Sequence, residues 1–228
     1  MKKRYRVKHI WPTVQGEGGF AGQPAVFVRL VGCNLWSGYD RDRQRDAERN
    51  GVHCPLWCDT DFTRAGSRFY TAGELAEAAR ACGPSIPLCV LTGGEPFLQI
   101  DDELIEDLHQ EGFMVAVETN GSRSLAETFQ RTPPDWIVCS PKFPAERVAL
   151  EVMDELKLVV PDYAPRDYES LIERVRPYQR GARLWRHLWL QPEDGPRWEE
   201  ARRIALEWAL RDPRWRVSVQ THKVLQVD

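Results

Sequence analysis

Three cysteines, Cys33, Cys54 and Cys58, are the residues of this chain best suited to bind a metal. Three thiolates can hold three irons of a [4Fe–4S] cluster, and because four would close every corner, the fourth iron stays open to a small molecule. The spacing is C-x20-C-x3-C. Three thiols with His53 as a fourth ligand would also suit zinc, so the ligand types leave both metals open.

A Gly-Gly-Glu-Pro turn at 93–96 follows these cysteines and ends a short apolar run at 88–91. Because Gly93 and Gly94 lack a Cβ, their backbone can approach a ligand closely and adopt unusual dihedral angles. An ordinary glycine turn is the alternative. The preceding cysteines favour the interpretation that the turn contacts a ligand.

Arg29 is a charged residue inside the otherwise apolar segment 25–30. Burying an unpaired guanidinium is costly, so Arg29 needs an anionic partner, and a substrate carboxylate would satisfy it with bidentate geometry. The alternative is an arginine near the end of a strand that reaches solvent.

The elements that must position these residues alternate between strand-like and helix-like patterns. Strands are expected at 25–30, 88–91, 114–118, 136–139, 156–160 and 188–190, and helices at 72–81, 102–110 and 197–211. Thr71 and Glu74 form a capping-box pattern at the first helix. This rhythm predicts an α/β fold with a mostly parallel sheet. Polar residues follow the strand ends, where such folds place ligand sites. About six strands predict an open, partial barrel.

Composition narrows the class of protein. The 228 residues suit a single domain over 1–228, and 42% hydrophobic residues with nine Trp suffice for a sizeable core. A net charge of −3 argues against a globally basic nucleic-acid binder. The sequence contains no run of eighteen apolar residues, so it predicts no membrane span. The basic N-terminus lacks a following apolar region, so we expect a cytoplasmic protein.

The segment 37–53 between the first two cysteines is crowded with charges of both signs. Its composition predicts a solvated loop or a short exposed helix, although its place makes it part of the metal site's architecture. Six cysteines in a chain of this kind favour thiols or metal ligands over disulfides. Cys82, Cys89 and Cys139 lie in apolar contexts and are expected to be small buried hydrophobes.

Several motifs in order along the chain resemble one family, the 7-carboxy-7-deazaguanine synthases, which are radical S-adenosylmethionine (SAM) enzymes of the queuosine and 7-deazaguanine pathway. The cysteine spacing departs from the superfamily's usual C-x3-C-x2-C, and 37–53 is similar to an insertion that some members carry. One extra residue also precedes Cys58. The motifs that carry the resemblance are Gln15-Gly16-Glu17-Gly18, 27–36, Cys58-Asp59-Thr60-Asp61, 92–96, Glu118-Thr119-Asn120-Gly121, 140–142 and 191–192.

The resemblance implies three cofactors: a [4Fe–4S] cluster on Cys33, Cys54 and Cys58, SAM, and a Mg²⁺ ion that receives the Thr60 hydroxyl. Asp59 or Asp61 would assist the Mg²⁺ or cap the loop. No catalytic residue is implied beyond the cluster and SAM. The implied substrate-binding residues are Gln15, Gly16, Glu17, Arg29 and Thr92. The implied SAM-binding residues are Gly93, Gly94, Glu95, Thr119, Asn120, Ser140, Pro141, Lys142 and Gln191.

Some of these assignments have a structural alternative. Glu95 would support its loop, and Thr119 and Asn120 would cap a turn. His222 and Lys223, near the end of the chain, are within possible reach of the site.

The resemblance further implies conversion of 6-carboxy-5,6,7,8-tetrahydropterin to 7-carboxy-7-deazaguanine with release of ammonia. A homodimer and a flavodoxin-like electron donor are implied as partners, with no nucleic acid and no membrane. Two alternatives remain at this stage. A glycyl-radical-activating radical SAM enzyme would leave 15–18 and Arg29 unexplained, and a zinc-stapled binding module would explain none of the motifs after the cysteines.

Overall fold

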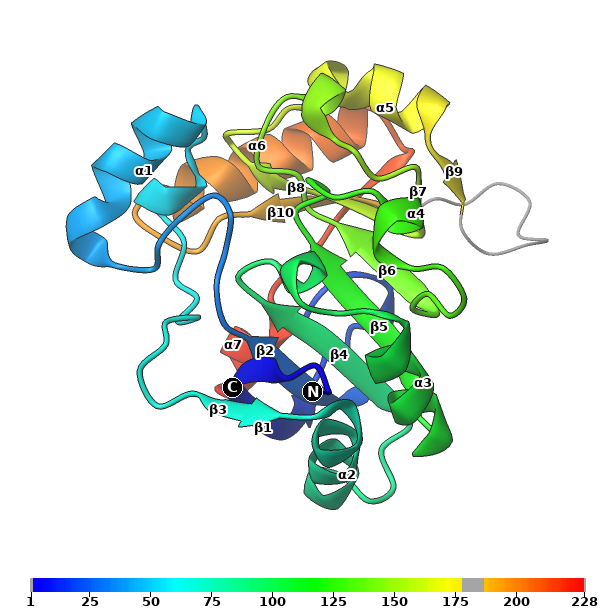
Figure 1. Cartoon of the computed structure of the whole chain (residues 1–228). Coiled ribbons are helices and arrows are strands. Elements are labelled where there is room, and N and C mark those ends of the chain that lie inside the picture. Colours follow the sequence, from blue (N-terminus) through cyan, green and yellow to red (C-terminus); the bar gives the residue numbers. More distant parts are fainter. Residues whose placement is uncertain (1, 178–186, 228) are drawn as a thin grey trace. The chain divides into compact units, whose positions relative to one another are not determined.

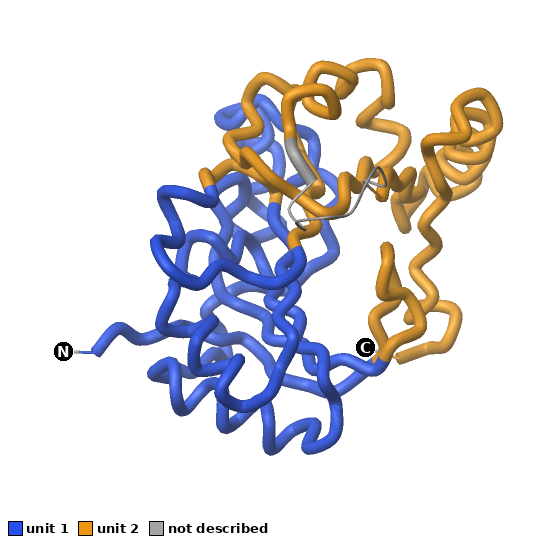
Figure 2. The backbone as a smooth tube through the Cα atoms, turned by 90° about the vertical axis from the view of Figure 1, so that its right-hand side faces the viewer, with its two compact units in different colours: residues 1–13, 24–119, 125–136 blue, residues 14–23, 120–124, 137–228 orange. Residues whose placement is uncertain are grey.

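The computed structural model describes residues 2–177 and 187–227. The chain divides into two compact units, which Figure 2 colours separately. Unit 1 comprises residues 1–13, 24–119 and 125–136, and unit 2 comprises residues 14–23, 120–124 and 137–228. The expectation of one domain over 1–228 stays a prediction.

Unit 1 carries the strands nearest the N-terminus (Figure 1). Strands β2, β4 and β5 are parallel, whereas β1 pairs with β3 in antiparallel fashion. In spatial order the strands are β3 (Arg68–Tyr70), β1 (Tyr5–Val14), β2 (Pro24–Leu30), β4 (Leu88–Gly93) and β5 (Met114–Thr119). The helices are α1 (Arg43–Asn50), α2 (Ala72–Cys82), α3 (Asp102–Gln110) and α4 (Leu125–Thr128), with 3-10 helices η2 (Asp40–Asp42), η3 (Cys54–Leu56) and η4 (Pro96–Leu98).

Unit 2 carries four parallel strands, apart from the first residue of β6. Their spatial order is β6 (Trp136–Cys139), β8 (Glu155–Val160), β10 (His187–Pro192) and β11 (Trp215–Val217). Two short strands, β7 (Val152–Met153) and β9 (Arg176–Pro177), form a separate pair. The helices are α5 (Glu169–Arg174), α6 (Trp198–Arg211) and α7 (Thr221–Leu225), with 3-10 helices η1 (Gly18–Phe20), η5 (Ala145–Arg147) and η6 (Pro165–Tyr168).

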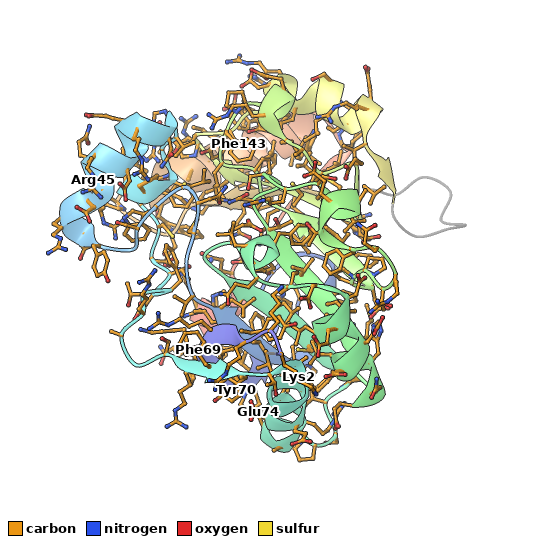
Figure 3. The ribbon with its side chains drawn as sticks, viewed as in Figure 1. Lys2, Arg45, Phe69, Tyr70, Glu74 and Phe143 are labelled. Carbon is orange, nitrogen blue, oxygen red and sulfur yellow. The ribbon has the colours of Figure 1, made fainter. Side chains whose placement is uncertain are left out.

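Local sequence explains where the main helices begin. At α2 the capping box is present: the Glu74 amide donates to Thr71 Oγ1, and the Thr71 amide donates to the Glu74 carboxylate. Glu74 is labelled in Figure 3. Asp101 caps α3 by accepting from the Leu104 amide at 3.2 Å. The apolar faces of these helices pack on β2 and β5. Their fully buried side chains include Leu75, Ala79, Leu104, Ile105 and Leu108.

All six strands and all three helices expected from the pattern are confirmed, with ends that coincide or differ by at most two residues. Strands β1, β3, β7, β9 and β11 were missed. In β1 the signal was present, because buried Tyr5 and Val7 alternate with Arg6 and Lys8 as on a half-buried strand. In the part of the chain that the structure describes, no helix is long and apolar enough to cross a membrane.

Candidate functional site

Two loops at the carboxyl ends of β2 and β4 are fastened together in unit 1. The strands are in register up to the pair Leu30 and Gly93, so the chain reaches Cys33 and Gly94 just beyond neighbouring strand ends. The Glu95 amide donates to the Gly32 carbonyl at 2.9 Å. A Cβ on Gly94 would overlap that carbonyl and lie 2.8 Å from the Cys33 Cβ. Only glycine fits at 94, because the Cys33 loop occupies the space that a side chain would need.

The other two candidate ligands, Cys54 and Cys58, lie at the two ends of one tight turn. Cys54 is buried at the start of η3, and the Cys58 amide donates to the Cys54 carbonyl at 2.9 Å. Cys33 is half-buried, and the Leu35 amide donates to its Sγ at 3.4 Å. Backbone hydrogen bonds therefore fix the local conformation around each of these thiols.

The thiol of Cys33 is held in its protonated form in the absence of a cation. Burial is the main cause that raises its pKa, to about 11. Hydrogen bonds from the Leu35 and Trp36 amides lower the pKa, whereas the charges of Glu95 and Cys58 raise it further. A bound metal cation reverses this balance, because metal-bound thiols lose their protons.

The donor set fits a [4Fe–4S] cluster in number and chemistry, because unit 1 carries the three thiols and one of them, Cys33, lies beside the glycine turn. Within residues 2–177 and 187–227, no three His, Cys, Asp or Glu side chains are already gathered in a metal-binding group. The assignment of Cys33, Cys54 and Cys58 as cluster ligands stays a prediction.

Asp61 anchors the loop after Cys58 through its side chain. Its carboxylate pairs with Lys8 at 2.7 Å and accepts from the Thr63 hydroxyl at 2.7 Å. The hydrogen bond from Lys8 is the main cause that lowers the pKa of Asp61 to about 2. Thr60 is half-buried immediately before this anchor. Asp61 thus fixes the loop that carries the Thr60 hydroxyl.

Arg29, Thr92 and Glu118 belong to one row of polar residues across β2, β4 and β5. Arg29 pairs with Thr92 in the strand register, so both side chains lie on the same face. The Thr92 hydroxyl donates to Glu118 Oε2 at 3.1 Å. The Arg29 guanidinium lies over the Trp11 ring, 4.8 Å from its centroid. Glu118 was missed as a candidate, although it stands in one of the quoted motifs.

Glu95 and Thr119, two of the expected SAM contacts, bond to each other. Glu95 is fully buried, and its carboxylate accepts from the Thr119 hydroxyl at 2.7 Å and from the Phe97 amide at 3.0 Å. This geometry favours the alternative in which Glu95 supports the glycine turn.

In unit 2, Glu17 of the Gln-Gly-Glu-Gly segment is engaged by two side chains from other parts of that unit. Its carboxylate forms an ion pair with Lys157 of β8 and accepts from the Gln220 amide at 2.7 Å. Burial alone would raise the pKa of Glu17, but the Lys157 charge and hydrogen bond lower it to about 2. Glu17 is therefore an ionised acceptor at neutral pH.

The C-terminal segment packs against the same loop. The Thr221 amide donates to the Gly16 carbonyl at 2.9 Å, and a Cβ on Gly16 would overlap the His222 imidazole. His222 therefore lies against Gly16 of the expected substrate loop, and its reach to the site itself stays a prediction. Lys223 instead pairs with Asp194 at 2.5 Å.

Glu155 of β8 and Ser218, which follows β11, also accept hydrogen bonds from this loop. The Glu155 carboxylate accepts from the Gly19 amide at 3.0 and 3.1 Å, and Ser218 Oγ accepts from the Gly18 amide at 3.2 Å. The same Ser218 hydroxyl donates to Gln191 Oε1 at 3.3 Å. Gln191, expected to bind SAM, is buried and bonds to the same serine that holds the Gly18 amide.

The remaining expected SAM contacts in unit 2 make local hydrogen bonds. Lys142 turns back onto Ser140, with Nζ 2.7 Å from the carbonyl and 2.5 Å from the hydroxyl. Buried Asn120 accepts from the Ser122 amide at 2.9 Å, which is the turn-capping alternative. Pro141 is buried between Ser140 and Lys142.

Sequence reasoning missed Lys157, Glu155, Gln220 and Ser218. Lys157 had a usable signal, because it is a charged residue in an apolar strand, the same pattern that singled out Arg29. The others had none, since their partners are backbone amides or side chains more than a hundred residues away.

Cys89 and Cys139 are fully buried, as expected for small hydrophobes, and Cys82 is half-buried. All six cysteines are free thiols in the structure.

Comparisons with known proteins identify the family. Residues 52–192 match the model of the Radical SAM superfamily. A 7-carboxy-7-deazaguanine synthase of Caulobacter vibrioides is 43% identical over 228 residues, covering 97% of this chain and 98% of the relative. One from Bradyrhizobium diazoefficiens is 43% identical over 232 residues, covering 98% and 99%. The crystal structure of QueE from Escherichia coli matches with a TM-score of 0.66 at 26% identity, covering 95% of this chain and 94% of that one.

These matches confirm the expected fold class, an open α/β partial barrel, and they confirm that the protein is an enzyme. Superfamily membership implies a [4Fe–4S] cluster and SAM as cofactors. The glycyl-radical-activating and zinc-module alternatives gain no support from them. The chain belongs to the 7-carboxy-7-deazaguanine synthase family of radical SAM enzymes.

Proposed function

We propose that this protein converts 6-carboxy-5,6,7,8-tetrahydropterin to 7-carboxy-7-deazaguanine with release of ammonia. The observation that carries the proposal is the similarity over nearly the whole chain to proteins named for that product, at 43% identity. When bound, the cluster and SAM supply the radical that removes a hydrogen from the pterin. The chain's own residues bind, orient and shield the reactants.

In unit 1 we assign the cofactor-binding residues. Cys33, Cys54 and Cys58 would hold three irons, and the backbone at Gly93 and Gly94 would bind SAM. The close packing of Gly94 against Gly32 and Cys33 supports this assignment, because it keeps the turn beside a ligand-bearing loop. Glu95 and Thr119 would act by stabilising that turn.

Substrate binding is assigned to residues of both units. In unit 1, Arg29 would pair with a substrate carboxylate, with Thr92 on the same face of the sheet. In unit 2, Gln15, Gly16 and Glu17 would bind the amino-pyrimidinone edge, and the ionised state of Glu17 makes it a strong acceptor. Asn120, Ser140, Pro141, Lys142 and Gln191 complete the proposed SAM-binding set.

Mg²⁺ is the third proposed cofactor, with the Thr60 hydroxyl as its ligand. Mg²⁺ retains several waters and substrate oxygens, so one protein ligand suffices. The anchoring of Asp61 by Lys8 and Thr63 supports a fixed position for Thr60. A Thr60→Ser variant should keep the Mg²⁺ response of the rate and Thr60→Val should weaken it; equal responses in both variants would remove Thr60 from the assignment.

We also propose a homodimer, a flavodoxin-like electron donor and a cytoplasmic location. Leu206 and Leu210 are exposed one turn apart on α6, which supports a self-association surface. Free thiols and a reducible cluster suit a reducing compartment. Sedimentation of the purified chain at several concentrations tests the dimer.

The deciding experiment supplies anaerobically reconstituted protein with SAM, a reductant, Mg²⁺ and 6-carboxytetrahydropterin. Mass spectrometry should detect 7-carboxy-7-deazaguanine, and Cys58→Ala should abolish it. A full [4Fe–4S] complement without product would overturn the specific reaction and leave a radical SAM enzyme with another substrate.

A further inference from the structure

Helix α1 lies inside the charged segment 37–53 (Figure 1), and one of its faces packs against η3, which begins at Cys54. The residues on that face are Arg43, Asp46 and Asn50, spaced three and four apart, as one side of a helix requires. The expected short helix is present, but the expectation that it is solvated or exposed is wrong for this face, because Asp46 is fully buried and accepts from the Ser37 amide outside the helix as well as from Arg45 within it.

Arg43 bonds to the turn that carries two cysteines. Its guanidinium donates to the Pro55 carbonyl at 2.5 Å and to the Cys58 carbonyl at 3.1 Å, and its Nε donates to Asp40 at 2.8 Å. The same guanidinium lies over the Trp36 ring, 4.3 Å from its centroid. Because the donor is charged, each bond to a backbone carbonyl is stronger than a neutral one.

Asp46 and Asn50 bond to the other side of the loop, just after Cys33. The Ser37 amide donates to Asp46 Oδ2 at 2.8 Å, and Asn50 Nδ2 donates to the Leu35 carbonyl at 2.7 Å. Hydrogen bonds from Ser37 and Arg45 outweigh burial and lower the pKa of Asp46, so it is ionised at neutral pH. Arg45 itself extends outward, as Figure 3 shows.

An aromatic pair continues this support toward Cys33. Trp36 meets Phe62 edge to face at a centroid distance of 5.3 Å, and the Phe62 carbonyl accepts from the Gly32 amide at 3.1 Å. Trp36 and Phe62 are both buried. Helix α1 is thereby linked to the backbone on both sides of the insertion, at 32–37 and at 55–58.

We propose that α1 is a staple of the cluster loop, in which Arg43, Asp46 and Asn50 are positioning residues that act through the backbone next to Cys33 and Cys58. The inference rests on the proposed function, which gives these cysteines their iron. Twenty residues separate Cys33 from Cys54, and ordering such a loop at the moment of cluster binding would cost conformational entropy. Helix α1 keeps the loop between Cys33 and Cys54 ordered before the cluster binds.

The first test uses the anaerobically reconstituted full chain. Arg43→Ala should lose iron to an added chelator about tenfold faster than the parent protein, since two charge-assisted bonds to the ligand turn are removed. Arg43→Lys, which keeps the charge and one donor direction, should recover part of the loss. Arg41→Ala is the matched control, because the Arg41 side chain is 82% exposed and contacts none of the loop carbonyls in the described hydrogen bonds.

Spectroscopy separates positioning from general stability. The electron paramagnetic resonance signal of the reduced cluster should broaden in Arg43→Ala and respond less to added SAM, while thermal unfolding of the metal-free variant stays near that of the parent protein. Iron release and resonance signals identical in Arg43→Ala, Arg41→Ala and parent protein would overturn the staple, even with product formation intact.

Hydrogen exchange of the metal-free protein makes the test independent of the proposed function. The Ser37 amide and peptides over 55–58 should exchange faster in Asp46→Ala and Arg43→Ala, whereas Asp46→Asn, which keeps an acceptor, should stay closer to the parent protein. Unchanged exchange would contradict the staple. A protein that assembles no cluster yet shows this exchange pattern would contradict only the iron-binding role.

Discussion

The ammonium of Lys157 and the carboxylate of Glu17 form an ion pair in which only 6% and 13% of the side chains remain exposed. Lys157 comes from the buried strand β8, and Glu17 comes from the loop that precedes η1, 140 residues earlier in the chain. Gln220 donates to the second carboxylate oxygen. Each buried charge thus has a partner, and the loop is fixed to the sheet of unit 2.

Lys157→Met should destabilise the protein and weaken substrate binding together. Removing one partner of a buried ion pair leaves an uncompensated charge, which typically costs about 3–5 kcal/mol. The pKa of Glu17 should then rise, because burial acts without the opposing lysine. Thermal unfolding and the KM for the pterin measure the two effects.

The double variant Lys157→Met with Glu17→Gln is the control for that experiment. It removes both charges, so most of the lost stability should return, while the KM stays raised because Glu17 is absent. A double variant no more stable than Lys157→Met would contradict a role for the unpaired carboxylate.

The same pair predicts an acid-labile contribution to stability. Glu17 has a pKa of about 2 in the folded protein against an ordinary 4.5, so its contribution is present above pH 4.5 and is lost as the pH falls toward 2. Urea unfolding at pH 6, 4.5 and 3.5 should show the gap between parent protein and Glu17→Gln narrowing as the pH falls. A gap independent of pH would contradict the ionised pair.

Gly94→Ala should abolish cluster assembly or SAM binding, because the new Cβ would overlap the Gly32 carbonyl beside Cys33. Gly73→Ala is a matched control in helix α2, where the added Cβ meets only Asp107 Oδ2, at 3.6 Å. The control should be neutral or stabilising by up to about 1 kcal/mol. Iron content and SAM binding measured by calorimetry compare the two.

The fold was largely predictable because its signals are local. The Thr71–Glu74 capping box and the apolar faces of the helices depend on residues within a few positions of each other. The parallel strands 88–91 and 136–139 read as short apolar runs for the same reason.

The network around the candidate site was less predictable because its partners are distant in sequence. Arg43 looked like one charge among many in a solvated segment, and only the structure shows that its guanidinium faces two carbonyls of the cysteine turn. The sequence left open whether Glu95 contacts SAM or supports its loop, and only the structure shows that its Oε1 accepts from both Phe97 and Thr119. The sequence shows that a residue is charged, but it does not show which backbone group that residue will bond to.

Glu95 offers a test that separates support from ligand binding. Glu95→Ala would leave the Thr119 hydroxyl and the Phe97 amide without their buried acceptor, and each such loss costs about 1–3 kcal/mol. Glu95→Gln keeps an acceptor oxygen in a side chain of the same shape, so it should retain most of the stability. Removing the negative charge should also lower the pKa of the Cys33 thiol, because Glu95 contributes to raising it.

The two possible roles of Glu95 therefore predict different combinations of SAM affinity and stability in Glu95→Gln and Glu95→Ala. If Glu95 supports the glycine turn, Glu95→Gln should bind SAM nearly as tightly as the parent protein, and the alanine variant should lose stability and SAM affinity together. A direct contact between the carboxylate and SAM would instead weaken binding in Glu95→Gln at unchanged stability. Unfolding curves and SAM titrations on the same two variants decide between them, and the full burial of Glu95 favours the first result.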